Sequence, residues 1–482
     1  LEVDLNLVKI VNINHSYNYF YPWEWGFLCF FVVFLSHNMN VEQLYSCFLQ
    51  SKGVTTDTRS CSEGMMFFAL KGERFNGNAY ARQALEAGCS FAVIDNAFYA
   101  DDADPRLLLV DDSLRALQLL ARHHRRQLGT PIVGITGTNG KTTTKELVAA
   151  VLSRKYATHY THGNLNNAIG VPLTLLQLTA KHELAIVEMG ASHPGDIREL
   201  VEIAEPDCGL ITNVGRAHLQ GFGSFEGVVR TKGELYDYLR TKEGSVVFIH
   251  ADNPHLTAIA DGLRLVRYGS HGDALSVSGH VPACDPYLQF CWTAEGEPEH
   301  AVATQLVGSY NVDNALAAIC VGRYFGVPAA DIDAAIAAYA PSNSRSQLLR
   351  TERNTLIVDA YNANPTSMTA ALQGFASMDA EQKWVIVGDM KELGAASDDE
   401  HQGIVRLLAA SGFQRIWLVG ANFAAAFGQV CEADRDINAS LFTLFPDADA
   451  VAQQLQTEPA EGYTVLIKGS NSMKLAPLSK LL

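Results

Sequence analysis

Short apolar runs alternate with longer amphipathic stretches through most of this 482-residue chain. Runs of β-branched and aliphatic residues between turn-forming residues are typical of buried strands. Apolar positions that recur every three or four residues are typical of helices that pack on one face. Strands that alternate with helices along a chain predict parallel sheets covered by helices, so the expected fold class is α/β.

The pattern divides the chain into three α/β domains, which we place at residues 39–129, 130–340 and 341–482. Strands are predicted at 66–70, 91–94, 107–110, 131–136, 184–189, 208–212, 245–249, 355–359, 384–388, 415–419 and 464–468. Helices are predicted at 78–87, 113–128, 143–153, 195–204, 226–240 and 311–325. Residues 340–344, Ala-Pro-Ser-Asn-Ser, are predicted to link the second and third domains.

Residues 1–38 do not fit this pattern. An aromatic stretch at 17–25 leads into the apolar run 27–35, which is shorter than the roughly 20 residues that a bilayer-spanning helix needs. Lys9 is the one basic residue before this run, and no small-residue cleavage motif follows it, so a signal peptide is not indicated. We therefore expect an upstream-translated, non-native extension before Met39, with a membrane anchor as the alternative.

The net charge and the positions of the cysteines argue against two classes of protein, general nucleic-acid binders and disulfide- or zinc-stabilised folds. The formal net charge of −16 argues against a general nucleic-acid binder, which would present a basic face. Phosphate ligands remain compatible with it, because backbone amides and a few cations can build an anion site locally. The nine cysteines are scattered and form no Cys-x-x-Cys pair, which is typical of reduced thiols in a cytosolic protein and not of a disulfide or zinc framework.

The strongest chemical signal is the loop at residues 137–144, Gly-Thr-Asn-Gly-Lys-Thr-Thr-Thr, between a predicted strand and a predicted helix. Glycines let backbone N–H groups approach a phosphate, and the N-terminus of the following helix adds the positive end of its dipole. Lys141 is expected to reach the outer phosphates, and the Thr142 hydroxyl is expected to bind Mg²⁺. The usual spacing would place a glycine at Ile135, so the motif departs from an ordinary phosphate-binding loop.

Polar residues near the ends of other predicted elements are further candidates, because ligands of open α/β sheets bind beyond the carboxyl ends of the strands. Glu188 ends a predicted strand and is expected to hold Mg²⁺ with Thr142; a surface glutamate is the alternative. His218 follows another strand, and a structural or solvated histidine is its alternative. Lys232 and Glu234 lie on a predicted helix, where a solvated charged face is the alternative.

The third domain offers a similar choice. Residues 359–365, Asp-Ala-Tyr-Asn-Ala-Asn-Pro, follow a predicted strand. Asp and Asn at such a turn are typical of helix caps as well as of ligand contacts, so capping of a helix that begins near Thr366 stays open. Arg345 is either a surface cation or an arginine that domain closure brings onto a phosphate.

Together these motifs resemble those of the Mur ligases, the ATP-dependent amide-forming enzymes of cytoplasmic peptidoglycan synthesis. The resemblance runs in order over residues 39–482 and rests on the motifs at 137–144, 163–174, 187–191, 359–365 and 388–394. Within the family it is strongest to the ligases that attach D-alanyl-D-alanine. It implies an N-terminal UDP-binding domain, a central P-loop ATPase domain with a parallel sheet and a C-terminal Rossmann-like domain.

The resemblance also implies roles for individual residues. Contacts to ATP are implied for Gly137, Thr138, Asn139, Gly140, Lys141, Thr142, Thr143, Asn311, Asn314, Arg345 and Asp359. Two Mg²⁺ ions are implied, with ligands from Thr142, Glu188, His218 and a carbamylated Lys232. Catalytic roles are implied for Lys141, His218, Lys232 and Arg345. Many relatives have histidine at Tyr310 and arginine at Asn471, so the contacts of these two positions stay open, with Lys474 as a substitute for the arginine.

Substrate contacts are implied in two regions. Those to the UDP moiety fall on Thr56, Asp57, Thr58, Arg59, Asn76 and Gly77. The others fall on Asn164, Asn166, Asn167, Tyr361, Asn362 and Asn364. Either meso-diaminopimelate or lysine fits as the third residue of the peptide.

The implied reaction joins D-alanyl-D-alanine to UDP-N-acetylmuramoyl-tripeptide through an acyl phosphate, with ADP and phosphate as the other products. A monomeric cytoplasmic enzyme of cell-wall synthesis, and so of cell shape and division, is expected, with no nucleic-acid or membrane partner. One alternative is folylpolyglutamate synthase, against which the uridine-type N-terminal domain and residues 359–365 count. The other is a P-loop switch or binding module, which should hydrolyse ATP without an amine acceptor.

Overall fold

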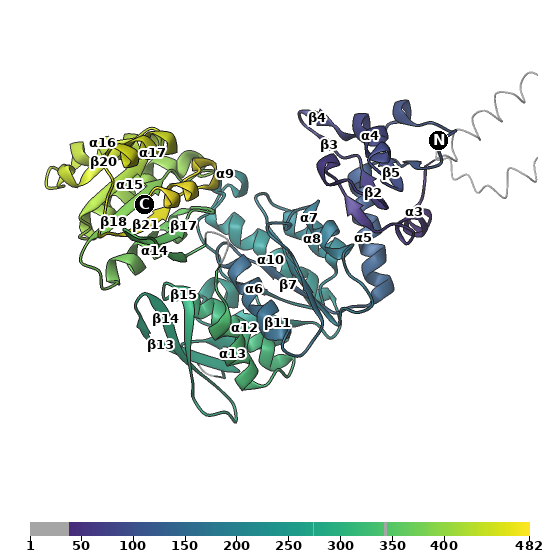
Figure 1. The fold of residues 1–482 in the computed structure, drawn as a ribbon. Helices are drawn as coiled ribbons and strands as arrows, with labels where there is room; N and C mark the ends of the chain where they lie inside the picture. The colour runs from purple at the N-terminus through teal and green to yellow at the C-terminus, as the bar shows by residue number, and fades with distance from the viewer. Residues whose placement is uncertain (1–37, 273, 342–344) are drawn as a thin grey trace, which may run out of the picture. The chain divides into compact units, whose positions relative to one another are not determined.

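The computed structural model describes residues 38–272, 274–341 and 345–482 (Figure 1). Apart from Asn38, the expected upstream extension lies outside the described residues. The described residues form two compact units, one up to His123 and the other from His124 to Leu482, and the division falls within helix α5 (Ser113–Leu128). In the described ranges, every helix is too short or too polar to cross a bilayer.

The first unit contains a four-stranded parallel sheet with the strand order β1-β2-β5-β6. Its strands are β1 (Gly53–Thr55), β2 (Met65–Phe68), β5 (Phe91–Ile94) and β6 (Leu107–Leu109), with a small antiparallel ribbon of β3 (Lys71–Gly72) and β4 (Phe75–Asn76). Its other helices are α3 (Val41–Phe48) and α4 (Ala81–Glu86). The three predicted strands are confirmed to within two residues, because the sheet buries each apolar run. Helix α4 is shorter than predicted, since Gly77–Tyr80 forms a separate 3₁₀ turn.

The second unit contains two sheets, the first of nine strands in the order β15-β14-β13-β12-β11-β10-β7-β9-β8. Its parallel strands are β7 (Ile132–Thr136), β8 (Thr158–Tyr160), β9 (Leu184–Glu188), β10 (Cys208–Ile211), β11 (Val246–His250) and β12 (Leu265–Gly269). The helices are α6 (Lys141–Leu152), α7 (Gly170–Leu175), α8 (Asp196–Ala204), α9 (Leu219–Phe222), α10 (Phe225–Thr241), α11 (Pro254–Ala258), α12 (Asn311–Tyr324) and α13 (Ala329–Ala338). Every strand and helix predicted here is present, because parallel strands buried on both faces have continuous apolar sequences.

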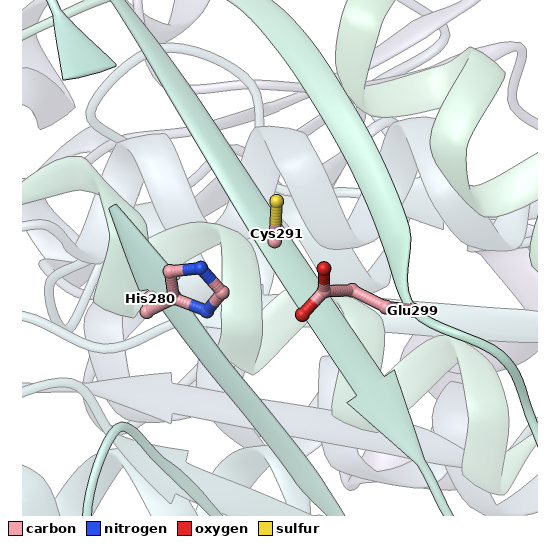
Figure 2. Close-up of side chains that lie close together, drawn as sticks. All are labelled: His280, Cys291 and Glu299. Atoms are coloured by element: carbon pink, nitrogen blue, oxygen red, sulfur yellow. The ribbon is translucent and has the colours of Figure 1, made fainter. Parts of the chain in front are cut away.

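One edge of this sheet is an antiparallel extension that the apolar runs did not predict. It consists of β13 (Val277–Cys284), β14 (Tyr287–Ala294) and β15 (His300–Val307). Phe290 and Trp292 of β14 are buried, whereas Cys291 between them faces outward and lies near His280 and Glu299 (Figure 2). Such alternation is typical of a sheet with one solvated face, and it breaks up the apolar runs by which parallel strands are recognised.

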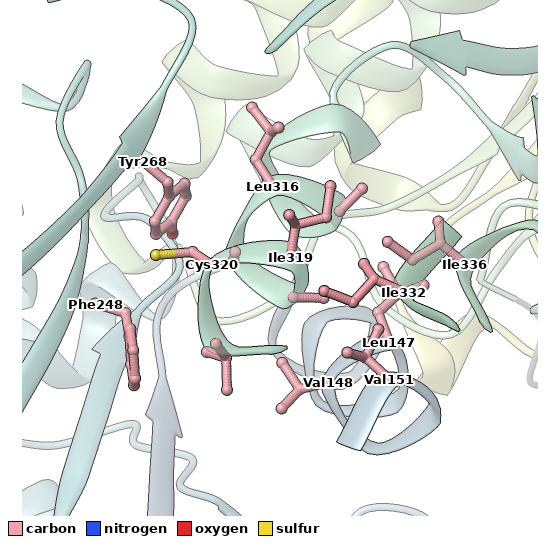
Figure 3. Packing of buried hydrophobic residues seen from close by; sticks show 14 of the residues in the cluster. Leu147, Val148, Val151, Phe248, Tyr268, Leu316, Ile319, Cys320, Ile332 and Ile336 are labelled. Atoms are coloured by element: carbon pink, nitrogen blue, oxygen red, sulfur yellow. The ribbon is translucent and has the colours of Figure 1, made fainter. Parts of the chain in front are cut away.

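Helices α6 and α12 pack together in the core of the central sheet (Figure 3). Leu147 and Val151 of α6 and Ile319 of α12 belong to one buried cluster. Gly322 of α12 lies so close to α6 that a Cβ atom there would contact Val151. Replacing a core leucine or isoleucine of this kind with alanine costs about 2–5 kcal/mol. This packing fixes the axis of α6, and with it the loop that precedes Lys141.

The C-terminal sheet has six strands in the order β16-β17-β21-β18-β19-β20. Its strands are β16 (Gln347–Arg350), β17 (Thr355–Asp359), β18 (Lys383–Gly388), β19 (Arg415–Val419), β20 (Phe442–Phe445) and β21 (Thr464–Lys468), all parallel except β16. Its helices are α14 (Pro365–Ser377), α15 (Ser397–Ala410), α16 (Ala421–Ala433) and α17 (Ala448–Thr457).

Helices cover both faces of the C-terminal sheet. Alternate residues of one strand face opposite clusters: Val385 belongs to one buried cluster, and Trp384 and Ile386 belong to the other. This is the doubly wound arrangement in which ligands bind beyond the carboxyl ends of the strands. The three-domain α/β architecture is confirmed, while the boundaries after residues 129 and 340 remain predictions.

Candidate active site

A cavity of about 580 Å³ lies in the second unit, where residues at the carboxyl ends of β7, β9 and β10 meet residues at the ends of β17 and β21. The predicted site residues that line it are Thr138, Asn139, Gly140, Lys141, Thr142, Thr143, Asn164, Asn166, Asn167, Glu188, His218, Asn311, Asn314, Arg345, Asp359, Tyr361, Asn362 and Asn364. Two predicted residues of this unit lie one contact behind the lining: Gly137, which accepts a hydrogen bond from Lys141, and Lys232, which donates one to Ala191. Ligands of open α/β sheets bind at such an edge.

The loop between β7 and α6 has the backbone of an anion site. Gly137 and Gly140 have φ values of 144° and 76°, in the region that favours glycine. A Cβ atom at Gly137 would contact Thr212, and one at Gly140 would contact Asn314. Within the described residues no side chain caps α6, so its first N–H groups and its dipole face the cavity.

Lys141 stands at the first position of α6. Its Nζ donates hydrogen bonds to the carbonyl oxygens of Gly137, at 2.9 Å, and of Thr138, at 3.0 Å. Burial lowers the pKa of the Lys141 amine to about 8, with Glu188 opposing this shift and Arg345 adding to it. The carbonyl oxygens of the loop therefore hold the protonated amine at the edge of the cavity, next to the backbone of the loop itself.

Glu188 is 1% exposed, which excludes the surface interpretation. The Thr142 hydroxyl donates to its two carboxylate oxygens at 3.2 and 3.0 Å, and the Asn166 amide donates to Oε1 at 2.8 Å. Thr161 fixes the backbone by accepting a hydrogen bond from the Glu188 N–H. A carboxylate beside a hydroxyl is a set of hard oxygen donors, which suits Mg²⁺.

Lys145 is a charged residue of this site that the sequence analysis missed. It is fully buried on α6, and its Nζ lies 3.9 Å from Glu188 and 3.6 Å from Glu146. Burial lowers the pKa of the Lys145 amine, and the two carboxylates oppose that shift. A usable signal was present, because residues three and four apart share a helix face, which places Lys145 beside Thr142 and Lys141.

His218 and Lys232 are the two further candidate metal ligands. His218 follows β10, and Lys232 of α10 contacts the segment that follows β9. His218, in a left-handed backbone conformation, has its Nδ1 in contact with the Glu392 carboxylate and lines the cavity. Lys232 is 2% exposed, and its Nζ makes a 3.4 Å contact with the Ala191 carbonyl and lies over the Phe222 ring. Burial holds the pKa values of both groups below their ordinary values, markedly so for Lys232. The solvated interpretation of Lys232 is therefore wrong.

The start of α12 closes the cavity beside the loop. Asn311 donates to the Val307 carbonyl at 2.8 Å, and Asn314 donates to Asn311 at 2.9 Å. Asn314 in turn accepts a hydrogen bond from Thr144 of α6 at 3.0 Å. Both asparagines are buried, and hydrogen bonds to neighbouring residues fix the orientation of their amides. Fixed amides of this kind can recognise the polar edge of a heterocyclic base.

The third domain contributes a cation and a carboxylate. The Arg345 guanidinium lies 3.8 Å from the centre of the Tyr361 ring, and its buried Nε has no hydrogen-bond partner among the described residues. Asp359 accepts hydrogen bonds from the Lys468 amine at 2.6 Å and from the Ser346 N–H at 3.2 Å. Tyr310 forms a 2.6 Å hydrogen bond with Ser346. Arg345 is therefore a cavity residue and not a surface cation.

Asn364 caps a helix, as one interpretation of its turn predicts, and a ligand contact at this turn stays a prediction. Its Oδ1 caps α14 by accepting from Ser367 N–H at 2.9 Å, and its Nδ2 donates to Asn139 of the phosphate-binding loop at 2.8 Å. Arg216 donates to Glu400 at 2.8 Å and adds a second link between the two sheets. Lys474 is exposed and is not among the described residues that line the cavity, and its substitution for an arginine contact stays a prediction.

The residues predicted to hold UDP lie in the first unit. Asp57 caps the turn that contains Thr58 and pairs with Arg59 at 2.6 Å, and hydrogen bonds from Arg59 lower the pKa of Asp57 to about 2. Asn76 caps the next turn, and a Cβ atom at Gly77 would contact the Leu70 carbonyl. Arg59 is exposed and can contact an anionic ligand on this unit.

Comparison with known proteins places this cavity in context. The model of the Mur ligase family catalytic domain matches residues 50–125, that of the Mur ligase middle domain matches 135–322, and that of the Mur ligase glutamate ligase domain matches 344–471. The UDP-N-acetylmuramoyl-tripeptide–D-alanyl-D-alanine ligase of Bacillus subtilis is 36% identical over 432 residues, which is 89% of this chain and 92% of that protein.

Two solved structures have the same architecture. A crystal structure of MurF from Acinetobacter baumannii superposes with a TM-score of 0.79 at 29% identity, covering 92% of this chain and 97% of that one. MurF ligase from Thermotoga maritima in complex with ADP superposes with a TM-score of 0.77 at 26% identity, covering 90% of this chain and 97% of that one. With the family models and the B. subtilis relative, these matches show that the chain belongs to the Mur ligase family.

Proposed function

We propose that this protein is an ATP-dependent ligase that joins D-alanyl-D-alanine to UDP-N-acetylmuramoyl-tripeptide. The relative with 36% identity carries this activity in its name, and the chain covers 92% of its length. The observation that carries the proposal is the cavity in which Lys141 and Glu188 of the central sheet lie with Arg345 and Asp359 of the C-terminal sheet. A cavity lined by two domains suits a reaction that must keep water from an activated acyl group.

The proposed chemistry has two steps. The terminal carboxylate of the tripeptide attacks the γ-phosphorus of ATP, which gives an acyl phosphate and ADP. The amine of D-alanyl-D-alanine then attacks the acyl carbon, loses a proton and expels phosphate. Lys141, the N-terminus of α6 and Arg345 supply the positive charge that such a transfer needs, and their work is positioning and electrostatic stabilisation.

The residues at the end of β9 fit Mg²⁺. The Glu188 carboxylate and the Thr142 hydroxyl would hold one ion, which would neutralise charge on the ATP phosphates. His218 and Lys232 would hold a second ion if Lys232 reacts with CO₂, since the carbamate exchanges an amine for a carboxylate-like ligand. The buried Lys232 amine, with its single long carbonyl contact, suits this reaction, because the neutral amine is the reactive form.

We further propose that the first unit binds the UDP moiety through Thr56–Arg59 and Asn76–Gly77, and that the enzyme is a cytoplasmic monomer. The exposed Arg59 guanidinium is a cation on this unit that can contact a diphosphate. The substrates are small molecules, so neither nucleic acid nor a membrane is required for the reaction.

Acceptor-dependent phosphate release tests the proposed function. Phosphate should appear only when UDP-N-acetylmuramoyl-tripeptide and D-alanyl-D-alanine are both present, and the assay should be run with the diaminopimelate and the lysine tripeptides. Equal release without the dipeptide would favour a P-loop hydrolase and overturn the ligase proposal.

Lys232 has its own test. The intact mass of the protein in bicarbonate should include one added CO₂, which is lost in Lys232→Ala. The Lys232→Ala enzyme should be inactive and should regain activity with short-chain carboxylic acids. Failure of both the mass change and the rescue would remove the carbamate from the scheme.

A further inference from the structure

The outer face of the antiparallel extension brings together an imidazole, a thiol and a carboxylate that the proposed reaction does not use. His280 of β13 is directly opposite Cys291 of β14, and Cys291 is opposite Ala301 of β15. Glu299 precedes Ala301 by two residues and so lies on the same face as Cys291. The donor atoms of His280, Cys291 and Glu299 all lie within 4.8 Å of one another (Figure 2). We call these three residues the outer triad.

The outer triad is separate from the cavity. None of its three members is among the described residues that line the cavity. It is also the one group of three His, Cys, Asp or Glu residues with donor atoms this close in the part of the chain that the structure describes. Sequence spacing conceals it, because the three donors come from three neighbouring segments of a sheet and not from a Cys-x-x-Cys pair.

The inner face holds these strands in place. Trp292, next to Cys291, is buried, donates from Nε1 to Asp333 of α13 at 2.7 Å and stacks on His300. His300, next to Glu299, shares a 2.7 Å hydrogen bond with the other oxygen of Asp333. Trp292 and His300 are thus both hydrogen-bonded to the Asp333 carboxylate. These bonds limit the movement of their neighbours Cys291 and Glu299.

The donor set selects the cation. Thiolate and imidazole are preferred by borderline-soft ions such as Zn²⁺, whereas Mg²⁺ takes oxygen ligands in near-octahedral geometry. Three protein ligands leave one tetrahedral position for water or an outside ligand. His280 and Glu299 are exposed and Cys291 is half-buried, so an ion can reach the site from solvent.

We propose that the outer triad binds one Zn²⁺ ion and that this ion ties β13, β14 and the start of β15 together. Binding releases the proton of the Cys291 thiol, because the thiolate is the ligand. An ion that binds the folded extension and not the unfolded chain stabilises the fold by mass action. The proposal does not depend on the ligase function, since it concerns a face that the cavity does not reach.

Cobalt substitution of the full chain tests the site. In the reduced protein, Co²⁺ should produce a thiolate-to-cobalt charge-transfer band in the near ultraviolet, at one equivalent, and Zn²⁺ should abolish that band by displacement. The Cys291→Ser variant should lose the band. Cys431→Ser, which removes a half-buried thiol of α16, is the matched control and should keep it.

Two further variants distinguish a three-ligand metal site from metal binding by the Cys291 thiol alone. His280→Ala and Glu299→Gln should each weaken Zn²⁺ binding by at least about tenfold. Loss of a residue that only orients a metal ligand already costs about 10–100-fold in affinity, so loss of a ligand itself should cost no less. The melting temperature should rise with Zn²⁺ in the wild type and not in Cys291→Ser. A band that survives Cys291→Ser, or equal Zn²⁺ affinity in all four proteins, would overturn the proposal, and ligase activity should not change in any of them.

Discussion

The two halves of the central sheet differ in where their polar side chains lie, because the parallel half buries charged groups and the antiparallel half exposes them to solvent. In the parallel half, at the ends of β7 and β9, Lys145 and Glu188 are charged groups removed from water, and Lys141 is half-buried. In the antiparallel half, His280 and Glu299 face solvent while the inner face packs against helices. Loop carbonyls accept hydrogen bonds from Lys141, and the Thr142 hydroxyl donates one to Glu188. The Lys145 amine has no hydrogen-bond partner among the described residues and is compensated by the nearby Glu188 carboxylate.

This difference has energetic consequences. A buried ion is costly unless it is paired and hydrogen-bonded, and removing one partner leaves the other uncompensated. Changes at the ends of β7 and β9 should therefore affect chemistry strongly, whereas changes in the antiparallel half should affect stability and leave the reaction intact. Four experiments test this contrast.

The largest effect is expected for Lys141→Ala. It removes a preorganised cation beside the phosphate-binding loop and should lower the rate of acceptor-dependent phosphate release by about 10²–10³-fold. Lys181→Ala, at an exposed position of the same unit, is the control and should retain the wild-type rate. Near-wild-type turnover of Lys141→Ala would mean that the loop does not hold the transferred phosphate.

Asn166→Ala should have the next largest effect. The Asn166 amide orients Glu188 with a 2.8 Å hydrogen bond, and loss of a group that orients a metal ligand costs about 10–100-fold in metal affinity. The Mg²⁺ concentration for half-maximal rate should rise by that factor. If the KM for the tripeptide rises instead, Asn166 is a substrate contact alone, as the family resemblance implies.

The pH dependence of the reaction should report the ionisation of Lys141. Its pKa is lowered to about 8, so the amine is cationic below that pH and neutral above it. The value of kcat/KM for ATP, which reports groups of the free enzyme, should therefore fall about tenfold per pH unit above pH 8. Lys141→Arg keeps its charge over this range, so its profile should be flat there, and an identical fall in both proteins would assign the titration to another group.

The smallest effect on chemistry is expected in the antiparallel half. Trp292→Phe removes the 2.7 Å hydrogen bond to Asp333 and should lower the free energy of unfolding by ~1–3 kcal/mol. Denaturant unfolding would measure this loss, and kcat should not change. A large fall in kcat would show that the two halves of the sheet are not independent.

The same contrast explains which parts of the fold were predictable. Strands such as β9, β17 and β21 are continuous apolar runs buried on both faces, and their bounds are confirmed to within one residue. Strands β13, β14 and β15 alternate buried and exposed residues, β8, β16 and β20 lie at sheet edges, and the first three residues of β12 are only half-buried. A search for apolar runs therefore recovers the strands with continuous apolar sequences, including the edge strand β6, and misses most of the half-buried or peripheral ones.

For the site, the sequence predicted individual residues better than their partners. Motifs locate Glu188, His218 and Arg345, which line one cavity in the second unit. Glu392, which contacts His218, and Lys468, which pairs with Asp359, come from distant segments that the folded sheet brings close. Pairings of this kind depend on strand order, so local sequence patterns cannot reveal them.

The central claim is that the cavity transfers phosphate from ATP to a peptide carboxylate and then forms an amide. The most direct measurement uses UDP-N-acetylmuramoyl-tripeptide with ¹⁸O at both oxygens of its terminal carboxylate and mass analysis of the released phosphate. An acyl phosphate intermediate transfers one carboxylate oxygen to phosphate, so the account predicts one ¹⁸O atom in each phosphate, dependent on D-alanyl-D-alanine. Unlabelled phosphate would contradict the account, because it would mean that water and not the carboxylate accepts the phosphoryl group.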